Sequence, residues 1–270
     1  MKKALQIGNG LALGSTVFIN YLSNTGLLNN TTIGEVSRNY KTLFTPAGYT
    51  FAIWGIIYLL LLSFVLYQGR SLFIFINRDD TFVLKTGWWF IISCVFNGLW
   101  VFAWIYGYTG LSCIFIFLLL ASLLKIVMNN RMELDDEPLP ILLFVWWPFV
   151  IYSGWVTVAS IANVSAYLVK IGWNGFGLDD FTWTAILIAL TVRLNQYMIR
   201  KRNMREFALV GAWALIGIGV ANSTSNEGIM YFAFAGASVL LISTAIHGYK
   251  NRATNAFVKY EQWKNSRVSQ

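Results

Sequence analysis

Apolar runs of about twenty residues recur along the whole chain, and they decide what it can fold into. A run of that length crosses the hydrocarbon core of a bilayer as an α-helix. Hydrophobic residues make up 57% of the 270 residues and charged residues only 12%. A soluble domain of this size would carry roughly a quarter charged residues. The sequence therefore predicts an all-α fold, a polytopic transmembrane helical bundle without a separate soluble domain.

Eight spans can be drawn, separated by polar or glycine-containing turns such as GYTG at 107–110 and NSTSNEG at 222–228. They cover 4–22, 49–68, 88–106, 110–128, 140–165, 183–199, 207–222 and 229–248. The first run follows two lysines and could be a signal peptide. Gln6 and Asn9 inside it, and the lack of a clear small-residue cleavage site, favour a retained helix.

The basic residues alternate between the two sides of such a bundle. The N-terminus, 69–87, 125–138, 200–206 and the tail after 248 hold sixteen of the 20 Lys and Arg residues. The opposite segments hold three, namely Arg38, Lys41 and Lys170, and Arg193 lies inside a span. Because cytoplasmic loops carry the excess of Lys and Arg, we expect both termini in the cytoplasm. The net charge of +8 is then explained by topology, and we expect no nucleic-acid partner.

Three of the predicted spans each carry aromatic residues and amides on one face. The spacing i, i+3, i+7 or i, i+3, i+11 puts the members of each set on the same side of a helix. The sets are Phe51, Trp54 and Tyr58; Asn97, Trp100 and Trp104; and Tyr152, Trp155 and Asn163. An amide in hydrocarbon is costly unless it is paired, so such residues are functional candidates. For a single ring, packing or an interfacial belt is the simpler interpretation; for the whole set, packing and a ligand pocket are weighed equally.

These segments also resemble the TspO/MBR family of tryptophan-rich sensory or translocator proteins. The family opens its second helix with the pattern Pro-Pro-x-Trp-x-Phe-x-x-x-Trp-x-x-x-Tyr, onto which Pro46, Trp54 and Tyr58 of TPAGYTFAIWGIIY fall. Asn97 and Trp100 match an Asn-x-x-Trp of the third helix. The fifth helix, FVWWPFVIYSGWVTVASIAN, is similar through its Trp-rich start, and Asn163 lies near a family Asn.

The chain departs from the family pattern at several positions. Thr45 stands where the first Pro is usual, Gly48 where a Trp is usual, and Trp155 where an Asn is usual, while Phe51 is displaced by one. The resemblance covers residues 1–168. We therefore expect a five-helix core over 1–168 and an additional three-helix membrane region with a basic cytoplasmic tail over 169–270, as a divergent, extended member.

The resemblance implies a five-helix bundle whose pocket opens toward the first loop, residues 23–48. It implies flat hydrophobic ligands, porphyrins and other tetrapyrroles or sterols, and roles in oxidative or light stress. Transport and light-dependent porphyrin breakdown are disputed activities of the family. We therefore expect an integral membrane protein that binds a porphyrin-like ligand at the nine residues named above and has a sensory or stress-response role.

Metal binding is a weaker hypothesis. Four acids, Glu35, Asp179, Asp180 and Glu227, are expected in loops on the outer side, where oxygen ligands could hold Ca²⁺ or Mg²⁺. We favour the simpler interpretation that they are solvated loop residues. His247, the only histidine, is expected near the cytoplasmic end of the last span, where it could join Glu or Asp in a metal site or switch with pH, although a lone interfacial histidine usually does neither.

Other classes of protein fit these features less well. With one His and few buried carboxylates, ordinary acid-base catalysis has little to work with, so we expect no catalytic residues. Covalent retinal needs a Lys deep in a span, and Lys125 and Lys250 lie at cytoplasmic ends. A transporter of small apolar molecules and a rhodopsin-like or metal-binding protein without covalent retinal stay open. The expected partners are the lipid bilayer and a planar hydrophobic molecule, and a homo-oligomer is left open.

Overall fold

The computed structural model describes the chain except residues 74–79, 252–257, 262–263 and 265–270. Most of the basic tail predicted after residue 248 lies outside the described residues. In the described part every regular element is a helix, so the predicted all-α fold class is confirmed.

Eight long helices occur in the described part of the chain, and each predicted span falls on one of them. They are α1 (Lys2–Asn24), α3 (Ile53–Phe73), α5 (Trp89–Ile105), α6 (Thr109–Asn129), α8 (Trp147–Lys170), α9 (Asp180–Arg202), α10 (Arg205–Ala221) and α11 (Glu227–Lys250). Short elements join them: α2 (Ile33–Asn39), α4 (Thr81–Thr86), α7 (Leu139–Ile141), the 3-10 turns η1 (Gly48–Ala52) and η3 (Gly175–Gly177), and the π-turn η2 (Leu142–Trp146).

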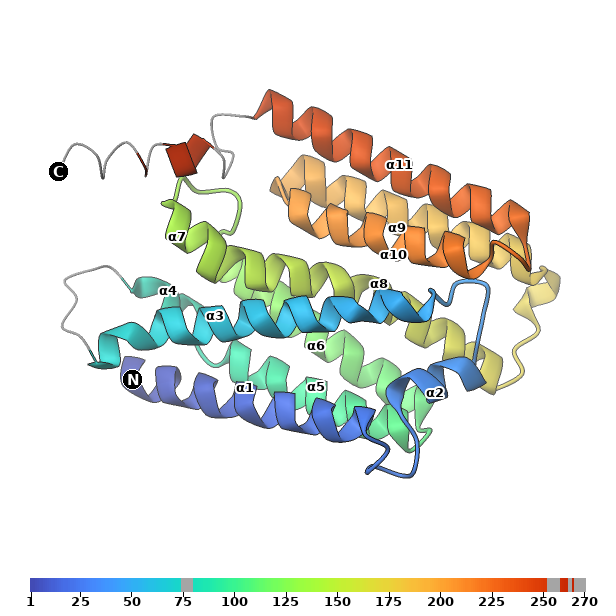
Figure 1. Ribbon diagram of the computed structural model, residues 1–270, viewed down its shortest axis with the longest axis horizontal. Helices are drawn as coiled ribbons and strands as arrows, with labels where there is room; N and C mark the ends of the chain where they lie inside the picture. The colour runs from blue at the N-terminus through green and yellow to red at the C-terminus, as the bar shows by residue number, and fades with distance from the viewer. Residues whose placement is uncertain (74–79, 252–257, 262–263, 265–270) are drawn as a thin grey trace.

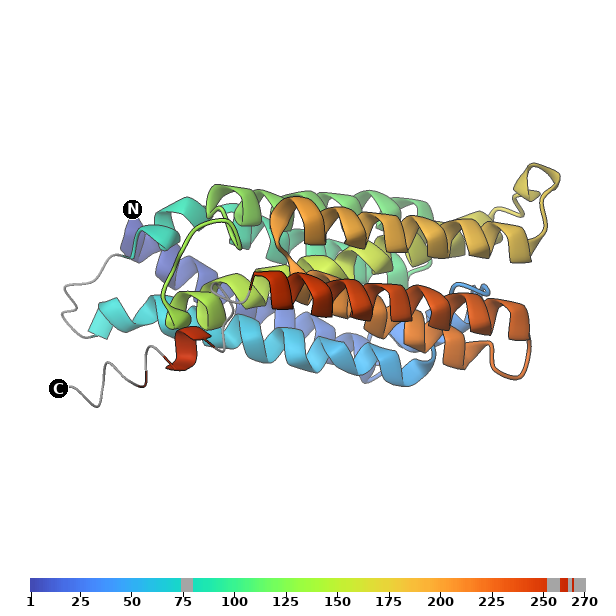
Figure 2. The same ribbon diagram turned by 90° about the horizontal axis from the view of Figure 1, so that it is seen from above.

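The long helices run side by side along the long axis of the molecule (Figures 1 and 2). Helices α1, α3, α5, α6 and α8 form one group, and α9, α10 and α11 lie on the other side of α8. Gly154 of α8 permits the close approach of α10, because a Cβ at that position would lie 3.0 Å from the carbonyl oxygen of Phe207. The division predicted at residue 168 falls in the last turn of α8 and stays a prediction.

Four of these helical segments are long and apolar enough to cross a membrane, judged by length and composition. They are Gly48–Phe73, Thr109–Asn129, Leu139–Lys170 and Glu227–Lys250, and the shorter helix Trp89–Ile105 is also apolar. Helices α1, α9 and α10 do not meet that criterion. Helix α1 begins and α11 ends at the same end of the bundle (Figure 1). Crossing by all eight helices, and the side on which the termini lie, stay predictions.

The polar residues of the first helix are paired inside the bundle. Asn9 donates from Nδ2 to Oε1 of Gln68 at 2.9 Å, and Gln6 donates to the backbone carbonyl of Gln68 and to Ser71 Oγ. Buried polar groups are stable when they are hydrogen-bonded in this way. Gln6 and Asn9, which favoured a retained first helix over a signal peptide, therefore join α1 to α3.

A buried carboxylate holds the neighbouring connection at that end. Asp80 Oδ2 lies 3.0 Å from Lys2 Nζ, and its Oδ1 lies 2.9 Å from Arg70 Nη2. The Asp80 side chain is only 1% exposed, so the two cations offset the cost of burying its charge. This triad joins α1, α3 and the start of α4, and no sequence pattern predicted it.

The start of α8 is irregular because of Pro148. Proline lacks a backbone N–H and its ring crowds the carbonyl four residues earlier, so a regular α-turn cannot pass through it. The chain forms the wide turn η2 over Leu142–Trp146 immediately before. Such insertions tilt a helix, and here they precede the aromatic residues of α8.

Candidate ligand-binding site

Trp54, on the first turn of α3, is the centre of an aromatic cluster. Its ring stacks on Tyr58 and Trp100, with centroids 5.6 Å and 6.2 Å away, and meets the edges of Tyr152 and Trp155 at 5.8 Å and 6.3 Å. These separations and angles are the ones that aromatic pairs prefer. The three faces predicted from helical spacing thus meet around one ring.

Two further pairs extend this cluster. Phe51 meets Trp155 edge-on at 5.8 Å, and Trp104 stacks on Trp100 at 6.3 Å. Seven of the nine predicted ligand-binding residues therefore belong to one continuous set of rings, which we call the aromatic cluster: Phe51, Trp54, Tyr58, Trp100, Trp104, Tyr152 and Trp155.

The two predicted amides hold rings in place. Asn97 is fully buried and donates from Nδ2 to the hydroxyl of Tyr152 at 2.8 Å, while its Oδ1 accepts from Nδ2 of Asn20 at 2.8 Å. Asn163 accepts at Oδ1 from Trp100 Nε1 at 2.8 Å and donates to Ser112 Oγ at 2.8 Å. Each amide therefore links helices and orients one ring of the cluster.

Asn20, the partner of Asn97, was not among the site residues predicted from the sequence. It lies near the end of α1 with only 6% of its surface exposed. Its signal was an amide within an apolar run, the same feature that singled out Asn97 and Asn163. The predicted site contained no residue of the first helix, so this link from α1 to α5 was not anticipated.

A cavity of about 60 Å³ lies beside the cluster, which we call the aromatic cavity. Six predicted residues line it: Phe51, Trp54, Trp100, Trp104, Trp155 and Asn163. The other three, Tyr58, Asn97 and Tyr152, are not part of the lining. Trp155 Nε1 is buried and has no hydrogen-bond partner among the described residues. A buried donor without a partner is uncommon, and a ligand seated against Trp155 after the neighbouring side chains move could satisfy it.

The first loop covers the aromatic cavity, as the resemblance implied. Ile33, Ser37 and Tyr40, in and just after α2, line it together with Thr45 and Pro46. Helix α2 begins with a capping box in which Thr32 and Glu35 exchange side-chain-to-backbone hydrogen bonds. The Trp104 Nε1 group donates to the carbonyl of Ile33 at 3.2 Å, which fastens α2 to α5.

The second half of this loop is held by α10. Ala47 donates its backbone N–H to the carbonyl of Gly217 at 3.0 Å, and Trp213 Nε1 donates to the carbonyl of Thr50 at 3.0 Å. Asn222 Nδ2 donates to the carbonyl of Leu43 at 2.8 Å. The additional three-helix region therefore positions part of the loop that covers the cavity. This contact between the first loop and α10 was not predicted from the sequence.

A second and larger cavity lies on the other side of α8, under the same loop. It has a volume of about 640 Å³ and is lined mainly by apolar residues of α8 and α9, which include Val164, Leu168 and Leu187. Trp173 and Trp183 lie at its end, with ring centroids 5.0 Å apart. We call it the α8–α9 cavity; no residue of the predicted ligand site lines it.

The size of the aromatic cavity decides how it can be used. Ligand pockets for drug-sized molecules typically span about 300–1,000 Å³, several times the 60 Å³ observed. Flat aromatic walls and one unpaired donor fit the chemistry of a planar hydrophobic ring. A ring of porphyrin size enters only when the covering loop moves away from the cluster.

The candidate metal ligands do not converge. Asp179 caps α9 by accepting from the backbone N–H of Thr182, which lowers the pKa of this carboxyl, and Glu35 serves the capping box of α2. Asp180 and Glu227 begin α9 and α11. His247 lies twenty residues along α11 from Glu227, about 30 Å away at 1.5 Å per residue. Among the described residues no group of three or more His, Cys, Asp or Glu side chains could hold one metal ion.

The opposite end of the bundle contains a cluster of buried and half-buried ionisable groups. Glu133, Arg205 and His247 line a small cavity there. Burial, reinforced by the nearby Glu206 carboxylate, raises the pKa of Glu133 well above its ordinary value. This cluster joins the loop after α6 to α10 and α11, far from both cavities under the first loop.

Comparison with known proteins supports the resemblance seen in the motifs. A family model described as TSPO-like protein matches residues 6–246. The match runs through both parts of the chain, beyond the 1–168 region from which the resemblance was drawn. No curated protein and no solved structure matches this sequence.

Proposed function

Because the chain belongs to the family of TSPO-like proteins, we propose that it binds a planar hydrophobic ligand, a porphyrin or related tetrapyrrole, at the aromatic cavity and acts as a sensory or stress-response protein. Membership makes the chain a helical membrane protein, in agreement with its apolar helices. The ligand and the sensory role are the proposed parts.

One observation carries the proposal: the packing of four rings from three helices around Trp54, beside a buried and unpaired Trp155 Nε1. Packing alone explains rings that contact one another. It leaves unexplained why the indole donor of Trp155 lacks a partner in a region where Trp100 and Trp104 both have one. A ligand acceptor group would satisfy it.

The expected affinity follows from the area that would be buried. A porphyrin-sized ring between aromatic walls removes several hundred Å² of apolar surface from water, at about 25 cal/mol per Å². The cost of ordering the ligand and of moving the loop reduces the resulting several kcal/mol. A dissociation constant of about 1 μM, which is a binding free energy of roughly −8 kcal/mol, is consistent with that balance.

A porphyrin titration in detergent, read by quenching of tryptophan fluorescence, tests the proposal. Trp54→Ala and Trp155→Ala each remove a wall of the cavity, and we expect the affinity to fall by about ten- to hundredfold. Trp100→Ala should act similarly, since it also removes the anchor of Asn163. Circular dichroism checks that each variant is folded.

Trp88→Phe is the matched control, because this residue is 55% exposed and lies outside the aromatic cluster. Its affinity should equal that of the wild type. If all three folded alanine variants bind porphyrin as tightly as the wild type, the rings only pack the bundle and the proposed site is wrong.

A further inference from the structure

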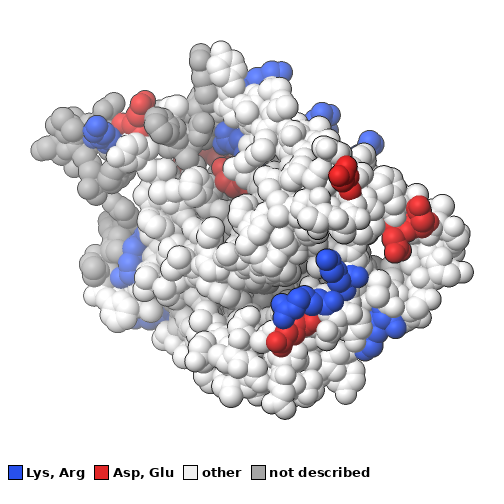
Figure 3. Space-filling view, turned by 45° about the vertical axis from the view of Figure 1, so that its right-hand side comes forward, with Lys and Arg blue, Asp and Glu red and all other residues white. Residues whose placement is uncertain are grey.

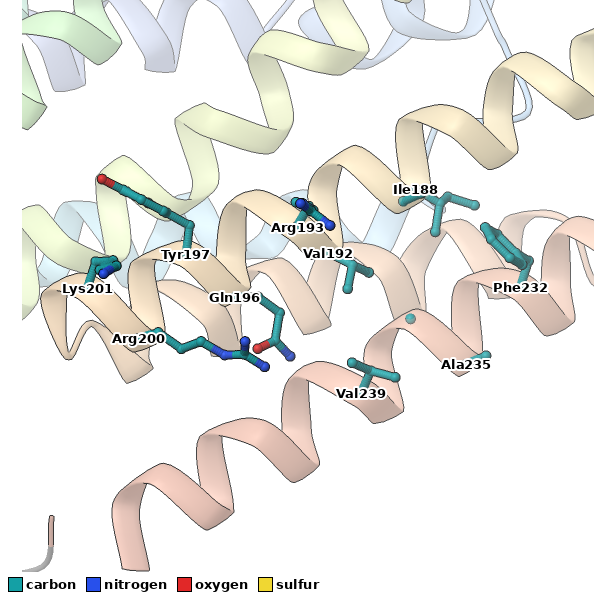
Figure 4. Close-up of a pocket in the computed structure, with 12 residues that line it drawn as sticks. Ile188, Val192, Arg193, Gln196, Tyr197, Arg200, Lys201, Phe232, Ala235 and Val239 are labelled. Atoms are coloured by element: carbon teal, nitrogen blue, oxygen red, sulfur yellow. The ribbon is translucent and has the colours of Figure 1, made fainter. Parts of the chain in front are cut away.

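The face of the bundle formed by α9 and α11 carries an open groove of about 650 Å³ (Figure 4). Its walls are apolar along most of their length, with Ile188 and Val192 from α9 and Phe232 and Val239 from α11. Gly236 keeps the two helices close at its floor, where a Cβ would lie 3.0 Å from Val192. The groove is independent of the aromatic cavity, since the two share no lining residue.

Basic residues line the end of this groove where α9 ends. Arg193, Tyr197 and Lys201 follow one another at i, i+4, i+8 and form one edge. Gln196 and Arg200 extend from α9 toward α11 (Figure 4). The described lining contains three cationic side chains and no carboxylate. The positive charge of this groove is therefore not neutralised from within.

Of the three cationic residues that line the groove, Arg193 lies farthest from the end of α9. It lies nine residues before the end of α9 at Arg202, about 14 Å along the helix at 1.5 Å per residue. It is exposed at the outside of the bundle, and none of the ion pairs among the described residues involves Arg193, Arg200 or Lys201. A cation at this depth in a membrane helix is costly unless it reaches an anion.

Gln196 provides a second, independent observation. Its Nε2 donates to Ser243 Oγ of α11, which fixes the amide in the groove. Its Oε1 is buried and has no hydrogen-bond partner in the described part of the chain. An unpaired acceptor among cations fits a ligand that presents a donor as well as a negative charge, such as a hydroxylated phosphate head group.

Charge, shape and depth together indicate one class of occupant. We propose that the α9–α11 groove binds an anionic phospholipid, with its phosphate between Arg193 and Arg200 and an acyl chain along Val192, Phe232 and Val239. Basic pockets between membrane helices bind such head groups, and Arg and Lys side chains reach along the helix toward the phosphate level.

The face of the molecule seen in Figure 3 agrees with this choice. Most of the surface seen in Figure 3 carries neither acidic nor basic side chains, as expected for a face in contact with lipid tails. A row of cations beside an apolar groove is suited to a lipid that is itself charged at one end and apolar along the rest.

The test uses the full chain, delipidated in neutral detergent, and measures the binding of phosphatidylglycerol and phosphatidylcholine from mixed micelles. We expect the wild type to prefer phosphatidylglycerol by about tenfold or more. Each basic residue near a membrane surface contributes about fivefold in affinity, so Arg193→Gln/Arg200→Gln should weaken phosphatidylglycerol binding by roughly 25-fold. Inorganic phosphate alone should not compete.

Two further variants keep the test decisive. Lys3→Gln/Lys125→Gln removes the same charge from exposed positions outside the groove and should change affinity by less than about twofold. Ala235→Phe fills the exposed apolar part of the groove, leaves every charge in place and should also weaken binding. The proposal is wrong if folded Arg193→Gln/Arg200→Gln and Ala235→Phe bind as the wild type does. It is equally wrong if the Lys variant loses as much affinity, or if inorganic phosphate displaces the lipid.

Discussion

Two cavities lie under the same loop, one on each side of α8, and they differ in volume and in the side chains of their walls. The aromatic cavity has about 60 Å³ and the α8–α9 cavity about 640 Å³. Residues 41–44 cover the larger one, and Tyr40, Thr45 and Pro46 cover the smaller one. On α8, Ala162 faces the smaller cavity and Val164 the larger one.

The comparison teaches that volume alone does not identify a binding site. The α8–α9 cavity has the space of a ligand pocket, yet its walls are mainly aliphatic, and the indole N–H of Trp183 is already bonded to the carbonyl of Gly175 at 2.8 Å. The aromatic cavity is too small as observed, yet five rings of the aromatic cluster line it: Phe51, Trp54, Trp100, Trp104 and Trp155. Specific polar groups in an apolar site fix the orientation of a ligand, and Trp155 lines the aromatic cavity with an indole N–H that has no hydrogen-bond partner among the described residues.

Substitutions on α8 that fill one cavity or the other should give the largest difference in porphyrin affinity. Ala162→Leu adds three carbons to the aromatic cavity, enough to occupy most of its volume, and should reduce porphyrin affinity by about ten- to hundredfold. Val164→Phe adds a similar bulk to the α8–α9 cavity and should change affinity by no more than about twofold. Fluorescence titration of both variants against the wild type measures the difference, and the opposite order would exchange the roles of the two cavities.

Gly217 tests how α10 holds the cover over both cavities. A Cβ at this position would lie 2.1 Å from Thr50 Oγ1, so Gly217→Ala must displace η1 or α10. Overpacking of this kind typically costs about 1–3 kcal/mol. We expect a lower free energy of unfolding in detergent and faster porphyrin association, since the displaced loop covers the aromatic cavity less tightly.

Gly55→Ala is the control for that substitution, because no neighbouring element in the described part of the chain lies within 4 Å of the added Cβ. It should be neutral or stabilising, as alanine is the better helix former. Equal losses of stability in the two variants would show that the contact between Gly217 and Thr50 does not hold the loop.

Trp104→Phe loosens the other half of the cover with a smaller effect. It removes the hydrogen bond to the carbonyl of Ile33 and keeps an aromatic ring stacked near Trp100. One such bond contributes about 0.5–1.5 kcal/mol, so porphyrin association should accelerate by about two- to tenfold. Stopped-flow fluorescence measures the rate. An unchanged rate in a folded variant would mean that movement of α2 does not limit entry.

The pH dependence of the melting temperature should depend on the end of the bundle that holds Glu133, and porphyrin binding on the other end. The pKa of Glu133 is raised by burial and by Glu206 to about 8, above the ordinary 4.5. The folded state therefore holds this proton more tightly than the unfolded state, so its contribution is fully present below pH 4.5 and is lost as the pH rises through about 8. The melting temperature should fall by a few °C between about pH 5 and pH 8.5.

Glu133→Gln should flatten that dependence, because the amide mimics the protonated carboxyl. Porphyrin affinity should not follow the same pH profile, since both cavities lie at the other end. A melting temperature of the wild type that rises over this interval would contradict the assignment.

The helices and their aromatic faces could be predicted because both follow from local sequence. Apolar runs determine the spans, and the spacing of Phe51, Trp54 and Tyr58 determines a face. The meeting of these faces around Trp54 required only that neighbouring helices pack. The family resemblance added the expectation that the first loop covers the site.

The remaining features depend on contacts between residues far apart in the chain. Asn20 pairs with Asn97 across 77 residues, and Asn222 holds Leu43 across 179. No local pattern contains such pairs, and cavity volume depends on how all the side chains pack. For the same reason the four acids of the candidate metal set were expected in loops, whereas the fold places them at the starts of α2, α9 and α11.

Locating a bound porphyrin tests the central claim most directly. A zinc porphyrin, bound to the full chain and located by anomalous diffraction, reports the position of the ring without any substitution. We predict that the metal lies between α3, α5 and α8, with the ring against Trp54 and Trp155 and the 40–46 segment displaced. A metal position in the α8–α9 cavity beside Trp183, or no ordered site at saturating porphyrin, would contradict the account.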